Sequence, residues 1–206
     1  MSKEIEFSEL MSSRFCHDLA GSIGAINNSI DFLDSKNEEM RNKAIDLVHF
    51  SSNQAINRVT FFRKAYGFAS KDIEVNLGDI RILITAFLDG AKLKINFDKS
   101  WDPTSVNGVL GKLILNAALI VASSIMHRGT IQLNIEGKKK VKIIADSESY
   151  KVSEELLEIL KGRGKSLEKN TRNIQHFYTY AVAKSINYDI DIENTSKGVL
   201  FTLSPL

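Results

Sequence analysis

Two long amphipathic segments open the chain, and a short polar break separates them. In residues 7–35 an apolar stripe recurs at spacings of three and four, which is typical of one face of an α-helix. This stripe consists of Phe15, Leu19, Ile23, Ile26, Ile30 and Leu33. Residues 38–69 carry a second stripe with a mean spacing of about 3.5, the seam of a coiled coil. It consists of Ile45, Val48, Ala55, Val59, Phe62 and Tyr66, with Ser52 filling one step.

Only Ser35-Lys36-Asn37 interrupts the two stripes, so we expect an antiparallel helical hairpin. A lone hairpin cannot bury both sides of its apolar stripe. Pairing of two hairpins into a four-helix bundle would bury it, which favours a homodimer. The alternative is that the rest of the chain covers the stripe.

From about residue 72 the pattern changes to short alternating strands and further helices, which predicts an α+β fold. Strands are expected at 73–75, 93–97, 131–135, 141–144, 190–192 and 199–201, and helices at 77–88, 106–124, 152–160 and 171–186. The strongly apolar helix at 106–124 should be buried. Gly137 predicts a hairpin turn, and Ser196-Lys197-Gly198 a second one. The boundary falls near residues 68–72, which gives one unit over 1–70 and a second over 71–206.

Composition limits the partners and the compartment. The 206 residues are 43% hydrophobic and 25% charged, as in an ordinary globular protein. A net charge of +2 gives no general electrostatic case for nucleic acid, and Lys138-Lys139-Lys140 is interpreted as a solvated turn. The single cysteine, Cys16, excludes an internal disulfide. No apolar run approaches the ~20 residues of a membrane span, and the N-terminus lacks a signal-peptide core. We therefore expect a cytoplasmic protein.

His17 is the most informative residue, because it lies almost opposite the apolar stripe of the first helix. Its neighbours on that face are small: Ser13, Ala20, Gly21 and Gly24. A glycine inside a helix costs about 1 kcal/mol relative to alanine, so two of them require a reason. One such reason would be that another protein must approach closely to a histidine that carries a phosphoryl group. The alternative is that the glycines let the second helix, or a partner hairpin, pack closely.

Three charged residues complete the predicted site. Asp18 is placed to hydrogen-bond the imidazole and fix its tautomer, or to act as a base, so we predict His17 and Asp18 as the catalytic pair. Arg14 lies one turn before His17, and Arg58 approaches from the second helix. Either arginine is a candidate to neutralise the phosphoryl charge, and the alternative for each is a solvated surface charge. His49, His127 and His176 lack metal-ligand spacing, so no metal site is predicted.

The run Cys16-His17-Asp18-Leu19, then Gly21, then Gly24-Ala25-Ile26-Asn27-Asn28, resembles the ChpT-type bacterial histidine phosphotransferases. The similarity is sharpest over residues 13–33, and Ser22 stands where histidine kinases usually carry proline. The order of elements resembles the kinase transmitter, in which a phosphoacceptor hairpin precedes an ATP-binding domain.

This resemblance implies a phosphotransferase in a bacterial phosphorelay of the cell cycle. His17 would accept a phosphoryl group from the aspartate of a receiver domain on a hybrid histidine kinase and pass it to response regulators. Magnesium would come with the receiver. We expect the receiver to contact Ala20, Gly21, Gly24, Asn27, Asn28 and Asp31 on the first helix, and Gln54 with Arg58 on the second.

The nucleotide motifs of kinases are incomplete in residues 71–206. Asn116 matches one of two magnesium-binding asparagines, but Lys112 occupies the position of the other. Asp146 stands where kinases begin a glycine loop, and neither glycine follows it. Residues 162–166 contain Gly-Lys-Ser without the earlier glycine of a P-loop, which Ile159 replaces. We therefore expect a degenerate ATPase domain that binds neither ATP nor another cofactor. Two alternatives stay open: an ATP-dependent histidine kinase with divergent motifs, and a non-catalytic scaffold that binds receivers.

Overall fold

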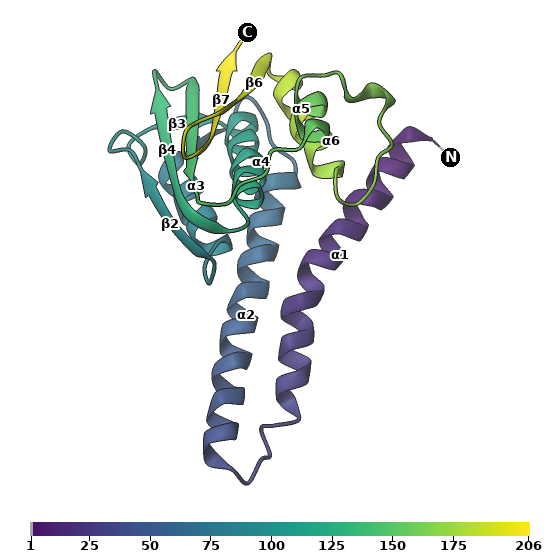
Figure 1. Ribbon diagram of the computed structural model, residues 1–206, viewed down its shortest axis with the longest axis vertical. Helices are drawn as coiled ribbons and strands as arrows, with labels where there is room; N and C mark the ends of the chain where they lie inside the picture. Colours follow the sequence, from purple (N-terminus) through teal and green to yellow (C-terminus); the bar gives the residue numbers. More distant parts are fainter. Residues whose placement is uncertain (1) are drawn as a thin grey trace.

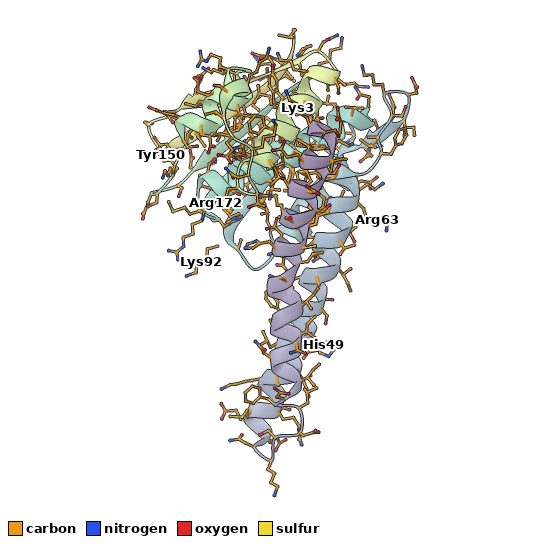
Figure 2. All side chains as sticks on the ribbon, turned by 90° about the vertical axis from the view of Figure 1, so that its right-hand side faces the viewer. Lys3, His49, Arg63, Lys92, Tyr150 and Arg172 are labelled. Atoms are coloured by element: carbon orange, nitrogen blue, oxygen red, sulfur yellow. The ribbon has the colours of Figure 1, made fainter. Side chains whose placement is uncertain are left out.

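A long helical hairpin projects from a layered α/β part in the computed structural model, which describes residues 2–206 (Figure 1). Helix α1 (Lys3–Ile30) and helix α2 (Glu38–Tyr66) run antiparallel, as the sequence predicts. Their lower halves extend away from the rest of the chain, and His49 lies on this projecting part (Figure 2).

The helix ends differ from the prediction for local reasons. Helix α1 begins at Lys3 rather than near residue 7, because the side chain of Ser2 accepts a hydrogen bond from the amide of Ile5 and caps the helix. It ends at Ile30 rather than near residue 35, where tighter turns follow. Helix α2 ends at Tyr66, three residues before the predicted end at 69, with Gly67 as its C-cap.

In the lower half of the hairpin, the residues that are buried between the two helices are small, and they lie outside the predicted apolar stripes. Ser22 and Ser29 of α1 are buried, as are Ala44 and Ser51 of α2. Small residues let two helices approach closely without large side chains between them. Several large apolar side chains are exposed instead, namely Ile23, Ile30, Ile45, Ile56 and Val59.

The upper half of the hairpin is covered by the α/β part. Phe15 and Leu19 pack against the main core, and the Phe15 ring lies 5.2 Å from Phe62 and 4.5 Å from Tyr66 between ring centroids. The alternative that the rest of the chain covers the stripe is therefore right for the upper half of α1. This alternative is wrong for the lower half, where the described residues leave the stripe uncovered.

The α/β part is an α+β arrangement around a mixed five-stranded sheet, which confirms the predicted fold class. Strand order is β2-β4-β5-β7-β6; β2 and β4 are parallel and the other pairs are antiparallel. A separate antiparallel pair is formed by β1 and β3. The strands are β1 (Glu74–Asn76), β2 (Lys92–Phe97), β3 (Ser105–Asn107), β4 (Arg128–Glu136), β5 (Lys140–Asp146), β6 (Tyr188–Asn194) and β7 (Gly198–Pro205). The helices are α3 (Leu77–Phe87), α4 (Gly108–Ser124), α5 (Glu154–Leu160), the short η1 (Gly164–Ser166) and α6 (Ile174–Ser185).

Strand β3 is the one strand that the sequence pattern missed. Its three residues pair with β1, so α4 begins at Gly108 instead of residue 106, and the side chain of Asn107 caps it by accepting from the amide of Leu110. A strand this short gives no periodic signal. The prediction that this helix is buried is confirmed, since most of its residues are buried.

The core of the α/β part continues into the end of the hairpin. Phe61, Phe62 and Ala65 of α2 belong to the same buried cluster as α4 and the inner face of the sheet. Trp101 is fully buried beneath α3, and its indole nitrogen donates to the Leu77 carbonyl at 2.7 Å. The division into two units near residues 68–72 stays a prediction, because α2 contributes to this shared core.

A buried amide pair ties three helices together at this junction. The Asn116 amide nitrogen donates to the carbonyls of Ala65 (2.9 Å) and Lys112 (2.8 Å). Its oxygen accepts from the Gln175 side chain at 2.6 Å, and the Tyr66 hydroxyl donates to Gln175. Because these amide groups find partners inside the protein, the pair fixes α2, α4 and α6 at little desolvation cost.

Among residues 2–206, no helix has both the length and the apolar character that crossing a membrane requires.

Candidate functional site

His17 lies on the outer face of α1, and 88% of its side chain is exposed. Its Nδ1 atom is 3.4 Å from Oδ1 of Asp18. A carboxylate can only accept, so Nδ1 is the donor in this contact, and in the neutral imidazole the lone pair is then on Nε2. The expected solvent-facing orientation of His17 is confirmed.

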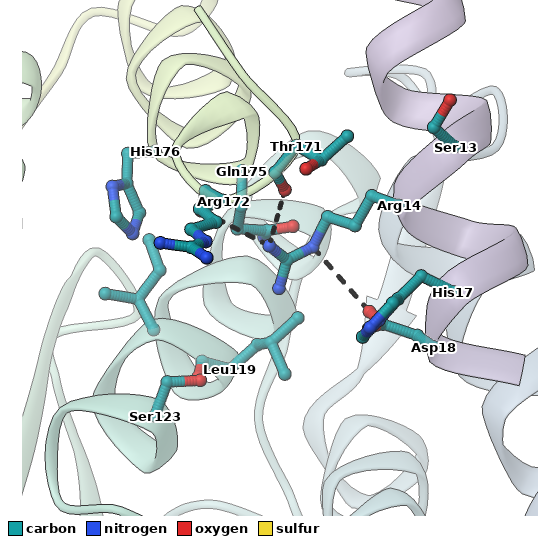
Figure 3. Close-up of a pocket in the computed structure, with 11 residues that line it drawn as sticks. Ser13, Arg14, His17, Asp18, Leu119, Ser123, Thr171, Arg172, Gln175 and His176 are labelled. Carbon is teal, nitrogen blue, oxygen red and sulfur yellow. Dashed lines mark hydrogen bonds and ion pairs between the residues drawn. The ribbon is translucent and has the colours of Figure 1, made fainter. Parts of the chain in front are cut away.

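Asp18 is shared between His17 and Arg14. While Oδ1 faces the imidazole, Oδ2 lies 3.6 Å from Nε of Arg14, and the side chain is only 23% exposed (Figure 3). One oxygen of the carboxylate therefore lies near a cation and the other near the histidine.

Both predicted arginines bind backbone carbonyl groups. Nη1 of Arg14 donates to the carbonyls of Thr171 (3.2 Å) and Arg172 (3.4 Å), in the segment that leads into α6 (Figure 3). Nη1 of Arg58 donates to the carbonyl of Asp18 at 3.1 Å, and its guanidinium lies over the Phe87 ring. The interpretation of Arg14 as a solvated surface charge is wrong, since its side chain is 19% exposed.

A pocket of about 680 Å³ lies beside His17, between α1, α4 and α6 (Figure 3). Its lining consists of Ser13, Arg14, His17, Asp18, Leu119, Ile120, Ser123, Thr171, Arg172, Gln175 and His176. Sequence reasoning missed the contribution of residues 171–176. They are more than 150 positions from His17, and only the packing of α6 brings them there.

His176 is a neutral, largely buried member of this pocket. Burial lowers the pKa of His176 to about 4, the charge of Arg14 lowers it further, and Glu155 opposes the shift. Its Nδ1 atom is buried and has no hydrogen-bond partner among the described residues.

Most of the predicted receiver surface is open. Ala20, Gly21, Asn27, Asn28 and Asp31 are exposed, and Gly24 is half-buried. A Cβ atom added at Gly21 or Gly24 would meet nothing within 4 Å in the described chain. The alternative that these glycines let α2 pack closely is therefore wrong.

Gln54 is placed differently from the rest of this surface. Its side chain donates to the Asp89 carbonyl at 3.3 Å, in the turn that follows α3. Together with Arg58 it lines a second, smaller pocket that also includes Asp18.

The glycines of residues 162–166 serve packing. Gly162 has a φ of +76° and lies against the Tyr180 hydroxyl, while a Cβ at Gly164 would contact Ile159. Arg163 forms a salt bridge with Glu158 at 2.6 Å. No group of three or more His, Cys, Asp or Glu side chains with the arrangement of a metal site occurs in residues 2–206.

Comparisons with known proteins agree on one family. A family model described as the histidine phosphotransferase C-terminal domain matches residues 77–198. The protein phosphotransferase ChpT of Brucella abortus (strain 2308) is 26% identical over 202 residues, which are 96% of this chain and 95% of that protein.

One solved structure shows the fold of this chain as a whole. A bacterial phosphotransferase has a TM-score of 0.84 at 23% identity and covers 99% of this chain and 98% of its own, which shows a common fold. The histidine kinase AdeS of Acinetobacter baumannii has a TM-score of 0.47 at 15% identity, covering 91% of this chain and 95% of its own.

Replacing Gly21 by alanine should stabilise the protein. The new methyl group enters open space in mid-helix, so the free energy of unfolding should rise by up to about 1 kcal/mol. Urea unfolding measures this. Gly67→Ala is the control and should destabilise, because its Cβ would collide with the Arg63 carbonyl. A loss of stability in Gly21→Ala would mean that something packs on this face.

His176 should make the protein less stable in acid. Between pH 6.5 and about 4, His176 is protonated in the unfolded chain but stays neutral in the folded chain. The free energy of unfolding therefore falls as the pH falls. The loss approaches about 3 kcal/mol below pH 4. Urea unfolding of His176→Gln should show a flatter pH dependence than wild type. His49→Gln, on exposed α2, should match wild type; equal slopes for all three would refute the assignment.

Proposed function

The chain belongs to the histidine phosphotransferase family, and we propose that its His17 carries a phosphoryl group between receiver domains of a bacterial phosphorelay. The observation that supports this most directly is the exposed Nε2 atom of His17 beside an open surface at Gly21 and Gly24. A receiver must bring an aspartate within bonding distance of this nitrogen, and side chains larger than glycine would hold it away.

In the proposed first step, the Nε2 lone pair attacks the phosphorus of an aspartyl phosphate on a receiver. The N–P bond forms while the bond from phosphorus to the carboxylate oxygen breaks, and its electron pair stays on the carboxylate. The proton on Nδ1 stays in contact with Asp18 throughout. Transfer to a second receiver is the reverse step, with the carboxylate of that receiver as nucleophile.

Such a transfer needs in-line positioning and charge neutralisation more than covalent chemistry from the protein. Asp18 positions the imidazole. Arg14 and Arg58 contribute positive potential close to His17, although each guanidinium also holds a backbone carbonyl. Magnesium would come with the receiver.

We propose that this chain takes its phosphoryl group from a receiver and does not use ATP. Two observations support the proposal. The side chain of Asn116, the residue that matches a kinase magnesium ligand, is fully buried and engaged with Ala65, Lys112 and Gln175. The residues directly after Asp146, Ser147-Glu148-Ser149, include neither glycine of the kinase loop, which brings the backbone close to a nucleotide.

We also propose that two hairpins pair into a four-helix bundle. The support is the row of exposed large side chains that the hairpin leaves unpaired: Ile23 (57% exposed), Ile30 (52%), Ile56 (62%) and Val59 (45%). Large apolar side chains exposed together on a helical pair are typical of an interface between copies.

A labelling assay tests the transfer. The purified protein is mixed with a phosphorylated receiver domain and magnesium, without ATP, and acid-labile, base-stable label is followed. Wild type should become labelled and His17→Ala should not, although His17→Ala should still bind the receiver. Label that appears only when ATP is added would favour the kinase alternative. Receiver binding without any label would favour the scaffold.

Sedimentation equilibrium tests the bundle. Wild type should have a mass near twice the 23.0 kDa of one chain. The double variant Ile56→Glu/Val59→Glu should be monomeric, because two carboxylates would be buried in the apolar interface. Asn28→Glu places a similar charge on the exposed polar face of α1 and should leave the mass unchanged. A monomeric wild type would overturn the proposal.

A further inference from the structure

Three side chains form a continuous path from His17 to the segment before α6. His17 Nδ1 faces one oxygen of Asp18 at 3.4 Å, and the other oxygen faces Nε of Arg14 at 3.6 Å (Figure 3). The same guanidinium donates to the carbonyls of Thr171 and Arg172, 157 and 158 positions away along the chain. The orientation of the phosphoacceptor is thereby linked to the position of a distant backbone segment.

We infer that Arg14 is a positioning residue: anchored on the carbonyls of Thr171 and Arg172, it holds the Asp18 carboxylate against Nδ1 of His17. This inference rests on the proposed function, because it assigns to Arg14 a part in the transfer that His17 performs. It differs from the expectation that Arg14 neutralises the phosphoryl group, since Arg14 here acts through Asp18.

The geometry of arginine suits this task. A guanidinium is planar and rigid, with five donors in fixed directions. When Nη1 is held by two carbonyls, the position of Nε is also restricted, and in this structure Nε lies 3.6 Å from Oδ2 of Asp18. A lysine has one rotatable ammonium group and transmits no such direction.

Burial makes the contact with Asp18 necessary for Arg14. The Nε atom is buried and has no hydrogen-bond partner within the described residues, so the carboxylate oxygen at 3.6 Å is the group that compensates it. Arg14 and Asp18 are one helical turn apart, where side chains meet on the same face. Because both side chains are at least three-quarters buried, water competes weakly for either.

Neighbouring charges do not provide the same orientation. Arg58 contacts the backbone carbonyl of Asp18 and not its carboxylate. His176 lines the pocket next to Arg14 and is neutral, while Arg172 offers its carbonyl to Arg14. Within the described residues, Arg14 is thus the cation whose side chain forms an ion pair with Asp18.

The consequence for chemistry is the tautomer of His17. A fixed carboxylate keeps the proton on Nδ1 and the lone pair on Nε2, directed to solvent where a receiver arrives. If Arg14 were lost, the carboxylate would be free to rotate away, and the histidine would spend time with the proton on Nε2. That form cannot attack phosphorus through the outer nitrogen.

The inference is tested with Arg14→Gln, Arg14→Lys, Asp18→Asn and the double variant Arg14→Gln/Asp18→Asn in the full chain. The tautomer of His17 is measured by ¹⁵N NMR of the imidazole nitrogens. The maximal rate of phosphotransfer is measured separately from the receiver concentration that gives half of it. Arg41→Gln, an exposed arginine on α2, is the matched control and should behave as wild type.

We expect Arg14→Gln to shift His17 towards the Nε2–H tautomer and to lower the maximal rate about ten- to a hundredfold. The half-saturating receiver concentration should change less than about twofold, and Arg14→Lys should recover part of both losses. In the Asp18→Asn background, Arg14→Gln should have no further effect, because Arg14 acts through that carboxylate.

Several results would overturn the inference. An unchanged tautomer in Arg14→Gln, or losses that multiply with those of Asp18→Asn, would mean that Arg14 acts independently of Asp18. A change confined to the half-saturating concentration would place Arg14 in receiver docking. The tautomer measurement needs no receiver, so it tests this link even if wild type never becomes labelled, a result that would instead refute the proposed function.

Discussion

The burial of Phe15 against the end of α2 determines how the candidate site is presented. Phe15 packs on Phe62 and Tyr66, and these aromatic rings join the core of the α/β part. Side chains two positions apart on a helix point about 200° away from each other. Since Phe15 faces inwards, His17 must face solvent. The same contact that holds α1 in place therefore also exposes the proposed phosphoacceptor.

The α/β part contributes structure at the positions where a kinase would need nucleotide chemistry. Asn116 and Gln175 use their amide groups to join α2, α4 and α6, so α6 is fixed relative to the hairpin. From that fixed position, the carbonyls of Thr171 and Arg172 reach Arg14. The α/β part thus anchors the helix that carries His17 through contacts of its own polar groups.

Local periodicity was sufficient to predict the hairpin, the exposed His17, the α+β class and six of the seven strands, because each depends on residues close together in sequence. It failed where the outcome depends on distant partners. In the lower half of the hairpin the buried residues are the small Ser22, Ser29, Ala44 and Ser51, which belong to neither predicted stripe, whereas in the upper half stripe residues do join α1 and α2. The contacts of Arg14 with residues 171–172 have no sequence signal at all, since hydrogen bonds to backbone carbonyls leave no pattern of residue types.

The distribution of stability along α1 follows from the same packing. Gly21 and Gly24 weaken the helix by about 1 kcal/mol each, in a region where the described chain offers no compensating contact. Helices in proteins are held mainly by tertiary packing, and α1 obtains that packing at Phe15 and Leu19, immediately above the glycines. The helix can therefore keep a small-residue surface next to His17 because its orientation is secured by neighbouring residues on the opposite face. The proposed transfer requires both close approach to the histidine and its rigid placement, which compete on one helix, and α1 offers the small residues and the packed residues on two different faces.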